Sequence, residues 1–170
     1  MIKIIGAVGE IKNIDDFLRA VSDFSKENDL LIQAFDANLI FGKNHIISSV
    51  NHAKRAIERK KNSTNSLKME TLLYSSGERQ LKLAIPKMGI KKGKSNITFL
   101  LLTQGNQFIS EKIVDKFLKD LTLKRDDKVL EGDKNTLKSF GINEKEIKTL
   151  PKEKYGILIL EKVAMVDLIK

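Results

Sequence analysis

The pattern of apolar residues changes several times along the chain, and the order of these changes restricts the fold more than any other feature. Apolar runs occur at Met1–Val8, which is rich in Ile, at Leu30–Phe35 and at Ile97–Leu102, and we expect each to form a strand. Between the first two runs, Asn13 can cap a helix over Asp15–Glu27. The chain therefore begins with a strand, a helix and a strand.

The long stretch between the second and third strands predicts three helices. His45–Lys61 has apolar residues along one face, and Asn44 before it can act as the N-cap. Leu67–Tyr74 predicts a short second helix. Ser75 and Glu78 have the spacing of a capping box, so we expect a third helix to begin there.

The last part of the chain predicts short helices and then a closing strand over Gly156–Val166. At 170 residues the chain is long enough for one domain with a proper core. We therefore expect an α+β fold in a single domain, residues 1–170, with one mixed or antiparallel sheet of about four strands. Its helices should lie mostly on one face, with a basic three-helix insertion over about residues 43–94.

Positive charge is concentrated in this insertion. Thirteen Lys or Arg and three Glu lie from Lys43 to Lys94, a net charge of +10, whereas the whole chain carries +9. The rest of the chain, with eighteen basic and nineteen acidic residues, is nearly neutral. A basic field confined to one segment is typical of proteins that bind nucleic-acid phosphates. A solubilising surface is the alternative that charge alone leaves open.

Recognition of RNA by this region would depend on charge and hydrogen bonds. Tyr74 is the only aromatic residue between Phe41 and Phe99, so we do not expect a stacking platform. We expect cations from separate helices to gather on one surface, with amide side chains near base edges or the 2′-hydroxyl. The candidate RNA-binding residues are Lys54, Arg59, Lys60, Lys61, Asn62, Arg79, Gln80, Lys87, Lys91 and Lys92.

No motif predicts an active site. His45 and His52 are seven residues apart, a spacing that does not suit one zinc ion, and we expect both to have structural roles. Gly6-Ala7-Val8-Gly9 lacks the spacing of a phosphate-binding loop, and we interpret it as a turn. We expect no catalytic residue, no metal, no cofactor and no small-molecule substrate. An enzyme would need a cofactor or metal that the sequence does not provide for.

Composition also bears on the compartment. The chain contains no cysteine, which excludes disulfides and thiolate metal sites and favours a reducing compartment. The apolar run at Met1–Ile5 is too short for a secretory signal. The longest later runs, Ile97–Leu102 and Gly156–Leu160, are far shorter than the ~20 residues of a membrane helix. We expect a soluble, cytoplasmic protein without membrane contact.

Two consecutive stretches of the basic region match a known pattern. They read DANLIFGKNHIISSVNHAKRAIERKK and NSLKMETLLYSSGERQLKLAIPKMGI. In these stretches the chain resembles the smallest core subunit of the KEOPS complex, the PRPK-binding protein (TPRKB) family, in an archaeal-type form. The matching residues are His45, His52, Ala53, Ala56, Ser66, Leu67, Glu70, Leu72, Leu73, Ser76, Gly77, Arg79, Gln80, Ala84, Ile85, Gly89 and Ile90.

The resemblance is dense over roughly Asp36–Leu102, with Leu81 where the family has Ile. The closing LEKVAMVDL fits the family's last strand, while the ends of the chain and Glu111–Lys154 match only in element order. The resemblance implies a noncatalytic subunit of the machine that installs threonylcarbamoyl on a tRNA adenosine. It implies that the subunit binds and stimulates a kinase-like ATPase and holds the single-stranded CCA tail of tRNA, while another subunit carries out the chemistry.

A pure interaction module without RNA binding is the alternative. It would use the basic surface to meet an acidic protein and would also need an exposed apolar patch. Our candidates for such a patch are Val163, Met165 and Leu168 in the closing strand. Burial of these three residues in the core is equally compatible with the sequence.

Overall fold

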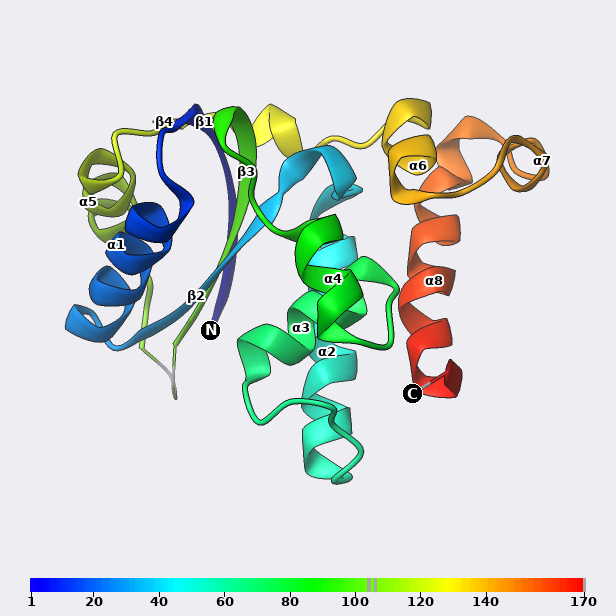
Figure 1. The fold of residues 1–170 in the computed structure, drawn as a ribbon, viewed down its shortest axis with the longest axis horizontal. Coiled ribbons are helices and arrows are strands. Elements are labelled where there is room, and N and C mark those ends of the chain that lie inside the picture. The colour runs from blue at the N-terminus through cyan, green and yellow to red at the C-terminus, as the bar shows by residue number, and fades with distance from the viewer. Residues whose placement is uncertain (104, 106, 170) are drawn as a thin grey trace. The chain divides into compact units, whose positions relative to one another are not determined.

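The structure is a computed structural model that describes residues 1–103, 105 and 107–169 (Figure 1). Its contacts divide the chain into two compact units. The sheet unit comprises Met1–Ala37 and Ile90–Val129, and the helical unit comprises Asn38–Gly89 and Leu130–Lys170. Helices together with one antiparallel sheet confirm the α+β class.

The sheet unit contains four antiparallel strands in the order β2-β3-β1-β4. Its elements are β1 (Ile2–Ile11), α1 (Ile14–Glu27), β2 (Leu30–Asp36), β3 (Gly93–Thr103), α5 (Glu111–Asp120) and β4 (Lys124–Arg125), with the 3-10 turn η2 (Asp127–Leu130) after them. The first three predicted strands and the capped α1 are therefore confirmed, and the Asn13 side chain accepts the Asp16 N–H at 3.0 Å.

One face of this sheet is covered by α1 and α5. Phe99 of β3 packs edge-on against Phe117 of α5, with ring centroids 4.8 Å apart. Phe24 of α1 lies 5.0 Å from the same Phe117 ring. Alternate residues of β1, including Ile5 and Ala7, complete this buried cluster, because successive strand residues point to opposite faces.

The interpretation of Gly6-Ala7-Val8-Gly9 as a turn is wrong, since all four residues lie inside β1. Gly6 instead allows the backbone of Asp126 and Asp127 to lie close against β1. The Gly6 N–H donates to Asp127 Oδ1 at 2.8 Å, and its carbonyl accepts the Asp126 N–H at 3.0 Å. A Cβ on Gly6 would lie 2.4 Å from the Asp126 carbonyl oxygen, which no side chain can accommodate.

The helical unit consists of helices packed around a core of small and aromatic residues. Its elements are η1 (Ala37–Leu39), α2 (Gly42–Glu58), α3 (Leu67–Ser76), α4 (Leu81–Met88), α6 (Lys134–Phe140), α7 (Glu144–Ile147), η3 (Lys152–Lys154) and α8 (Tyr155–Ile169). α2, α3 and α4 are the predicted three-helix insertion. One buried cluster joins Ala53, Leu73, Tyr74, Ala84 and Val163 from α2, α3, α4 and α8.

The third helix of the insertion does not begin at Ser75. α3 continues through Ser76 and ends at Gly77, whose φ of 68° is the left-handed conformation of a helix C-cap. The Ser75 hydroxyl donates to the Thr71 carbonyl at 2.8 Å, so it satisfies its own helix instead of capping the next one. The Ser75–Glu78 spacing was therefore a chance match to a capping box.

The predicted closing strand is also wrong, because Gly156–Val166 lies within the helix α8. Its apolar residues cover both sides of the run, so periodicity alone does not distinguish a buried strand from a buried helix. The length of the apolar run distinguishes the two, since a run as long as Gly156–Val166 is more typical of a helix than of a strand. The fourth strand of the sheet is β4, two residues that pair with Ala7 and Val8. None of the described helices is long and apolar enough to cross a lipid bilayer.

Candidate nucleic-acid interface

The end of α2 places three consecutive cations outside the helix. α2 begins at Gly42, not after an Asn44 cap, and ends at Glu58, so Arg59, Lys60 and Lys61 follow it. The Lys61 N–H bonds back to the Ala56 carbonyl at 2.8 Å, which is the closing bond of a Schellman motif. Lys60 has a φ of 56° at the position where glycine is usual. A side chain in that conformation costs about 1–2 kcal/mol.

A buried carboxylate holds the loop that follows these cations. Glu70 in α3 has no exposed surface. Its carboxylate accepts the Ser63 N–H at 3.1 Å and the Thr64 N–H at 3.0 Å. Bonds to a charged acceptor are roughly twice as strong as neutral ones, so they fix the loop backbone directly after Lys61. Within this loop, the Asn62 amide donates to the Thr64 carbonyl at 2.9 Å.

Several of these groups line a cavity of about 430 Å³ in the helical unit. Its lining residues are Arg55, Ala56, Arg59, Lys61, Tyr74 and Asp167, from α2, the turn after it, α3 and α8. The volume lies within the roughly 300–1,000 Å³ range of small-molecule sites. Three exposed cations against one carboxylate give the cavity a net positive charge, which suits phosphate groups.

Asp167 links α2, α3 and α8 at this cavity. One carboxylate oxygen accepts the Tyr74 hydroxyl, and the other lies 2.7 Å from His52 Nδ1. The Tyr74 and His52 rings stack with their centroids 5.4 Å apart. Burial acts to raise the pKa of Asp167, but the bonds from Tyr74 and His52 outweigh it and leave the pKa below its ordinary value. Asp167 is therefore ionised at neutral pH.

Tyr74 remains a hydrogen-bond donor in this arrangement. Burial raises the pKa of its phenol, and the bond to the Asp167 carboxylate raises it further. The phenol therefore carries its proton at neutral pH. The expected structural role of His52 is consistent with its place between the Tyr74 ring and the Asp167 carboxylate.

Lys87, one of the RNA-binding candidates, is engaged inside the helical unit. Its ammonium lies 3.1 Å from the Glu78 carboxylate and 4.2 Å from the centre of the Phe140 ring. The lysine is thus used for an ion pair and a cation–π contact, which together account for its position.

The other candidates do not line the basic cavity. Lys54 and Arg79 are exposed on α2 and before α4, and Gln80 is the N-cap residue of α4. Lys91 and Lys92 are exposed and belong to the sheet unit. RNA binding by these five residues stays a prediction.

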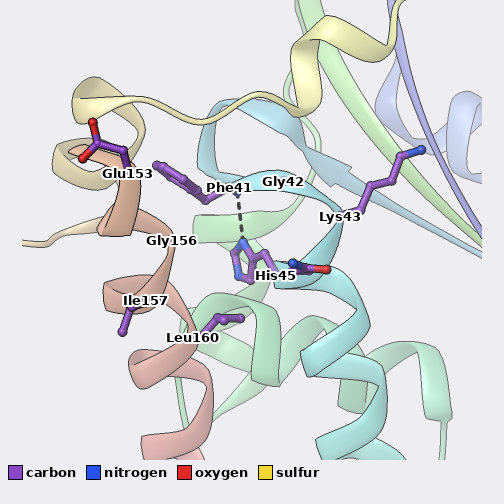
Figure 2. A pocket seen from close by; sticks show the side chains of 9 residues that line it. Phe41, Gly42, Lys43, His45, Glu153, Gly156, Ile157 and Leu160 are labelled. Carbon is purple, nitrogen blue, oxygen red and sulfur yellow. Dashed lines mark hydrogen bonds between the residues drawn. The ribbon is translucent and has the colours of Figure 1, made fainter. Parts of the chain in front are cut away.

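A second cavity, of about 440 Å³, lies at the start of α2 (Figure 2). Phe41, Ile157 and Leu160 give it apolar walls, and Figure 2 shows the Lys43 and Glu153 side chains extending away from His45. This cavity has no cluster of cations, and its lining differs in kind from that of the basic cavity.

His45 beside this second cavity is part of the core. Its Nδ1 accepts the Phe41 N–H at 3.2 Å and its Nε2 lies 2.9 Å from the Ser75 carbonyl (Figure 2 draws the first bond). Burial lowers the pKa of His45 to about 4, with a smaller contribution from Lys87. The ring is neutral, buried and bonded at both nitrogens, as expected of a structural histidine. In the described part of the chain, no group of three or more His, Asp or Glu is placed to hold a metal ion.

Comparison with known proteins identifies the family. The model of the family described as "Kinase binding protein CGI-121" matches residues 9–167. The chain belongs to the CGI-121 family. This result confirms the resemblance to the PRPK-binding protein family, and the match extends over both units. No curated protein matches the chain significantly.

All residues that line the basic cavity lie inside the CGI-121 match, but sequence reasoning missed three of the charged and aromatic ones. Arg55 is four residues before Arg59, and this spacing places both on one helix face. The same rule would have preferred Arg55 over Lys54. No spacing in the sequence indicates that Tyr74 and Asp167 lie at the cavity, because their position there depends on how α3 and α8 pack.

The three candidates for partner binding separate into two groups on α8 of this CGI-121 family member. Val163 is fully buried in the helical unit, so it belongs to the core. Met165 and Leu168 are exposed, by 42% and 76%. Ile157 and Ile169, also on α8, are exposed large apolar residues as well.

Proposed function

We propose that this CGI-121 family member is the noncatalytic subunit of the KEOPS tRNA-modification complex that binds the kinase-like ATPase, stimulates it and recruits tRNA by its CCA tail. Family membership supports the kinase partner, since the family is described as kinase-binding. The observation that carries the tRNA part is the basic cavity lined by Arg55, Arg59 and Lys61. The absence of cysteine favours the cytoplasm as the compartment.

The charge pattern supports contact with a phosphate chain. Of the three glutamates in the insertion, Glu70 is buried and Glu78 is paired with Lys87, which leaves only Glu58 to oppose the exposed cations. Neighbouring cations repel one another, and bound phosphates relieve that repulsion. We infer that a single-stranded RNA segment follows the turn after α2 and enters the cavity.

A binding experiment with two forms of the same tRNA tests this proposal. Intact tRNA should bind more tightly than tRNA trimmed of its CCA tail, because the tail enters the cavity and the body of the tRNA does not. The salt dependence should also steepen by roughly 0.7 in log–log slope for each single-strand phosphate contact. Equal affinity of the protein for trimmed and intact tRNA would contradict tail recognition.

For the kinase partner we propose the exposed face of α8. α8 is rich in apolar residues, although Glu161, Lys162 and Asp167 are charged. It leaves four large apolar side chains exposed to solvent: Ile157, Met165, Leu168 and Ile169. Burial of these side chains against a partner would stabilise a complex by about 25 cal/mol per Å² of apolar surface removed from water.

Paired substitutions test the kinase surface. Met165→Glu with Leu168→Glu should abolish co-purification with the kinase-like subunit while the circular-dichroism spectrum stays that of the wild type. Leu18→Glu is the matched control, because Leu18 is also an exposed leucine, at 46%, but lies on α1. Equal loss in both variants, or no loss in either, would remove the α8 face from the proposal.

The pure interaction module is the second candidate, and the exposed apolar side chains of α8 are the observation that favours it. Charge reversal at Lys60 and Lys61 separates the two functions. Lost kinase binding with intact tRNA binding would favour the interaction module. Lost tRNA binding with intact kinase binding would favour the recruiting subunit.

A further inference from the structure

The basic cavity contains a group that phosphate binding does not explain. Asp167 lines the same cavity as Arg55, Arg59 and Lys61, and a carboxylate there weakens the attraction for any phosphate. Its side chain is 46% exposed, so it is available to a bound molecule. A site built only for phosphates would be stronger without it.

The carboxylate is held in a fixed position with acceptor capacity to spare. Tyr74 donates to one oxygen and His52 lies against the other, so the group cannot turn away from the cavity without breaking both bonds. A carboxylate offers about four acceptor positions, and these two contacts occupy two of them. The remaining positions are free to accept hydrogen bonds from a ligand.

The surrounding charge restricts what that ligand group can be. A phosphate would be repelled by Asp167, and an ammonium would be repelled by the three cations. A neutral donor meets neither penalty, and a hydroxyl is the neutral donor that RNA carries on its sugar. The cavity therefore suits a molecule with phosphate on one side and free hydroxyls on the other.

In an RNA chain only the 3′-terminal nucleotide has this combination. An internal nucleotide carries phosphate on its 3′ oxygen, whereas the last one has a phosphate on the 5′ side and a free 2′,3′-diol. We propose that Asp167 accepts hydrogen bonds from the diol of an RNA 3′ end, so that the protein selects tRNA with a free terminal ribose. This inference rests on the proposed recruitment of the CCA tail.

The consequence is a selection step before modification. An aminoacylated tRNA carries an ester on one of the two hydroxyls, which removes a donor to Asp167 and adds bulk inside the cavity. A 3′-phosphorylated end carries a charge that Asp167 repels. Mature and uncharged tRNA is therefore the form that the cavity accepts.

The test uses one tRNA prepared with different 3′ ends: the natural diol, a 3′-phosphate and a 3′-deoxy end. Binding to the full-length protein is measured by fluorescence anisotropy at one fixed salt concentration. The diol should bind about tenfold or more tightly than the 3′-phosphate, because a bond to a charged acceptor is replaced by repulsion. The 3′-deoxy end, which loses one donor without gaining charge, should fall between the two.

Asp167→Asn tests the residue, since it removes the charge and keeps the size. The variant should lose most of the preference for the diol and bind the 3′-phosphate end more tightly than the wild type does. Glu153→Gln is the control, because this exposed carboxylate lies at the other cavity. It should leave the order of the three ends unchanged.

Equal wild-type affinity for the diol and the 3′-phosphate overturns the inference. If intact tRNA is still preferred over CCA-trimmed tRNA in the same assay, the proposed function survives that result. An Asn variant that binds all three ends more tightly by one common factor also overturns it, since Asp167 would then be only a repulsive charge. The wild-type comparison needs no variant, so the test holds even if Asp167→Asn fails to fold.

Discussion

The two units of the molecule differ sharply in charge, although each buries an apolar core. The helical unit has 18 basic and 10 acidic residues, a net charge of +8, whereas the sheet unit has 13 and 12, a net charge of +1. A general need for solubility would distribute the excess over both units. The confinement to one unit supports the proposed contact of the helical unit with RNA phosphates.

The units also use their carboxylates differently. In the sheet unit, Glu111 is exposed and pairs with both Lys3 and Arg125, each at 2.6 Å, so the acid neutralises neighbouring cations. In the helical unit, Glu70 is buried and binds backbone N–H groups instead. Glu58 is then the one glutamate of the insertion that is neither buried nor ion-paired with a described residue, and Asp167 lines the cavity of the cations from α8.

Charge reversal in each unit gives the largest test of this comparison. Changing Arg55, Arg59 and Lys61 together to Glu should weaken tRNA binding by about 1,000-fold at low salt, because attraction to phosphates becomes repulsion. The same change at three exposed lysines of the sheet unit should weaken it far less. Filter binding at several salt concentrations measures both effects, and the slope should flatten only in the first variant.

The matched lysines of the sheet unit are Lys12, Lys112 and Lys119. Both triple variants change the net charge by the same amount, so a field effect of the whole protein would act equally on the two. A similar loss of affinity in both variants would mean that total charge, and not the cavity, governs binding.

Acid sensitivity is a second difference, since both histidines belong to the helical unit. The folded-state pKa of His45 is about 4, below the 6.5 of an unfolded histidine, so the unfolded state binds the proton more tightly. The contribution of His45 to the free energy of unfolding should therefore be fully present above pH 6.5. It should be lost as the pH drops from 6.5 to 4. The loss from this group should reach about 3 kcal/mol.

Urea denaturation at pH 7 and pH 4 checks this prediction against a His45→Asn variant, which is less stable at pH 7 but lacks the titrating ring. The variant should lose about 3 kcal/mol less than the wild type between the two pH values. Hydrogen exchange should show α2 and α3 opening before β3 and α5. An equal pH dependence in the wild type and the variant would show that folding does not shift the pKa of His45.

The sheet unit was largely predictable from sequence and the helical unit only in part. β1, β2 and β3 are recognisable in the sequence as apolar runs between turn residues, and Asn13 indicates the start of α1. The prediction of a turn at the glycines of β1 was wrong because sequence does not distinguish two uses of glycine. A glycine can be needed for a turn or for the close approach of another backbone segment. That distinction depends on Asp126, 120 positions away in the chain.

For the candidate site, sequence located the cations but not the cavity. Arg59 and Lys61 were predicted from local charge density, which is a property of neighbours in the chain. Tyr74 and Asp167 reach the cavity from α3 and α8, and α8 was predicted as a strand. Rules based on spacing along the chain do not predict which residues the packing of helices brings to a cavity.

Glu70→Gln sharpens the contrast between buried and exposed carboxylates. Loss of the charge weakens the bonds from Ser63 and Thr64, and we expect a loss of about 2 kcal/mol in the free energy of unfolding. The loop after Lys61 should exchange its amide hydrogens faster, and tRNA affinity should fall with it. Glu111→Gln in the sheet unit should cost much less stability, because its partners remain hydrated. A smaller effect at position 70 than at 111 would contradict the role given to Glu70.

The smallest expected effect concerns the backbone at the end of α2. Lys60 and Thr122 both have a φ of 56°, one in each unit, and both should become more favourable as glycine. Lys60→Gly and Thr122→Gly should each raise the free energy of unfolding by about 1 kcal/mol, measured by urea denaturation. Only Lys60→Gly should weaken tRNA binding, by several-fold, because it also removes a cation from the edge of the site. A strained lysine that contributes to binding has a reason to persist, whereas a Lys60→Gly variant with unchanged affinity would leave the strain at that position without a functional cause.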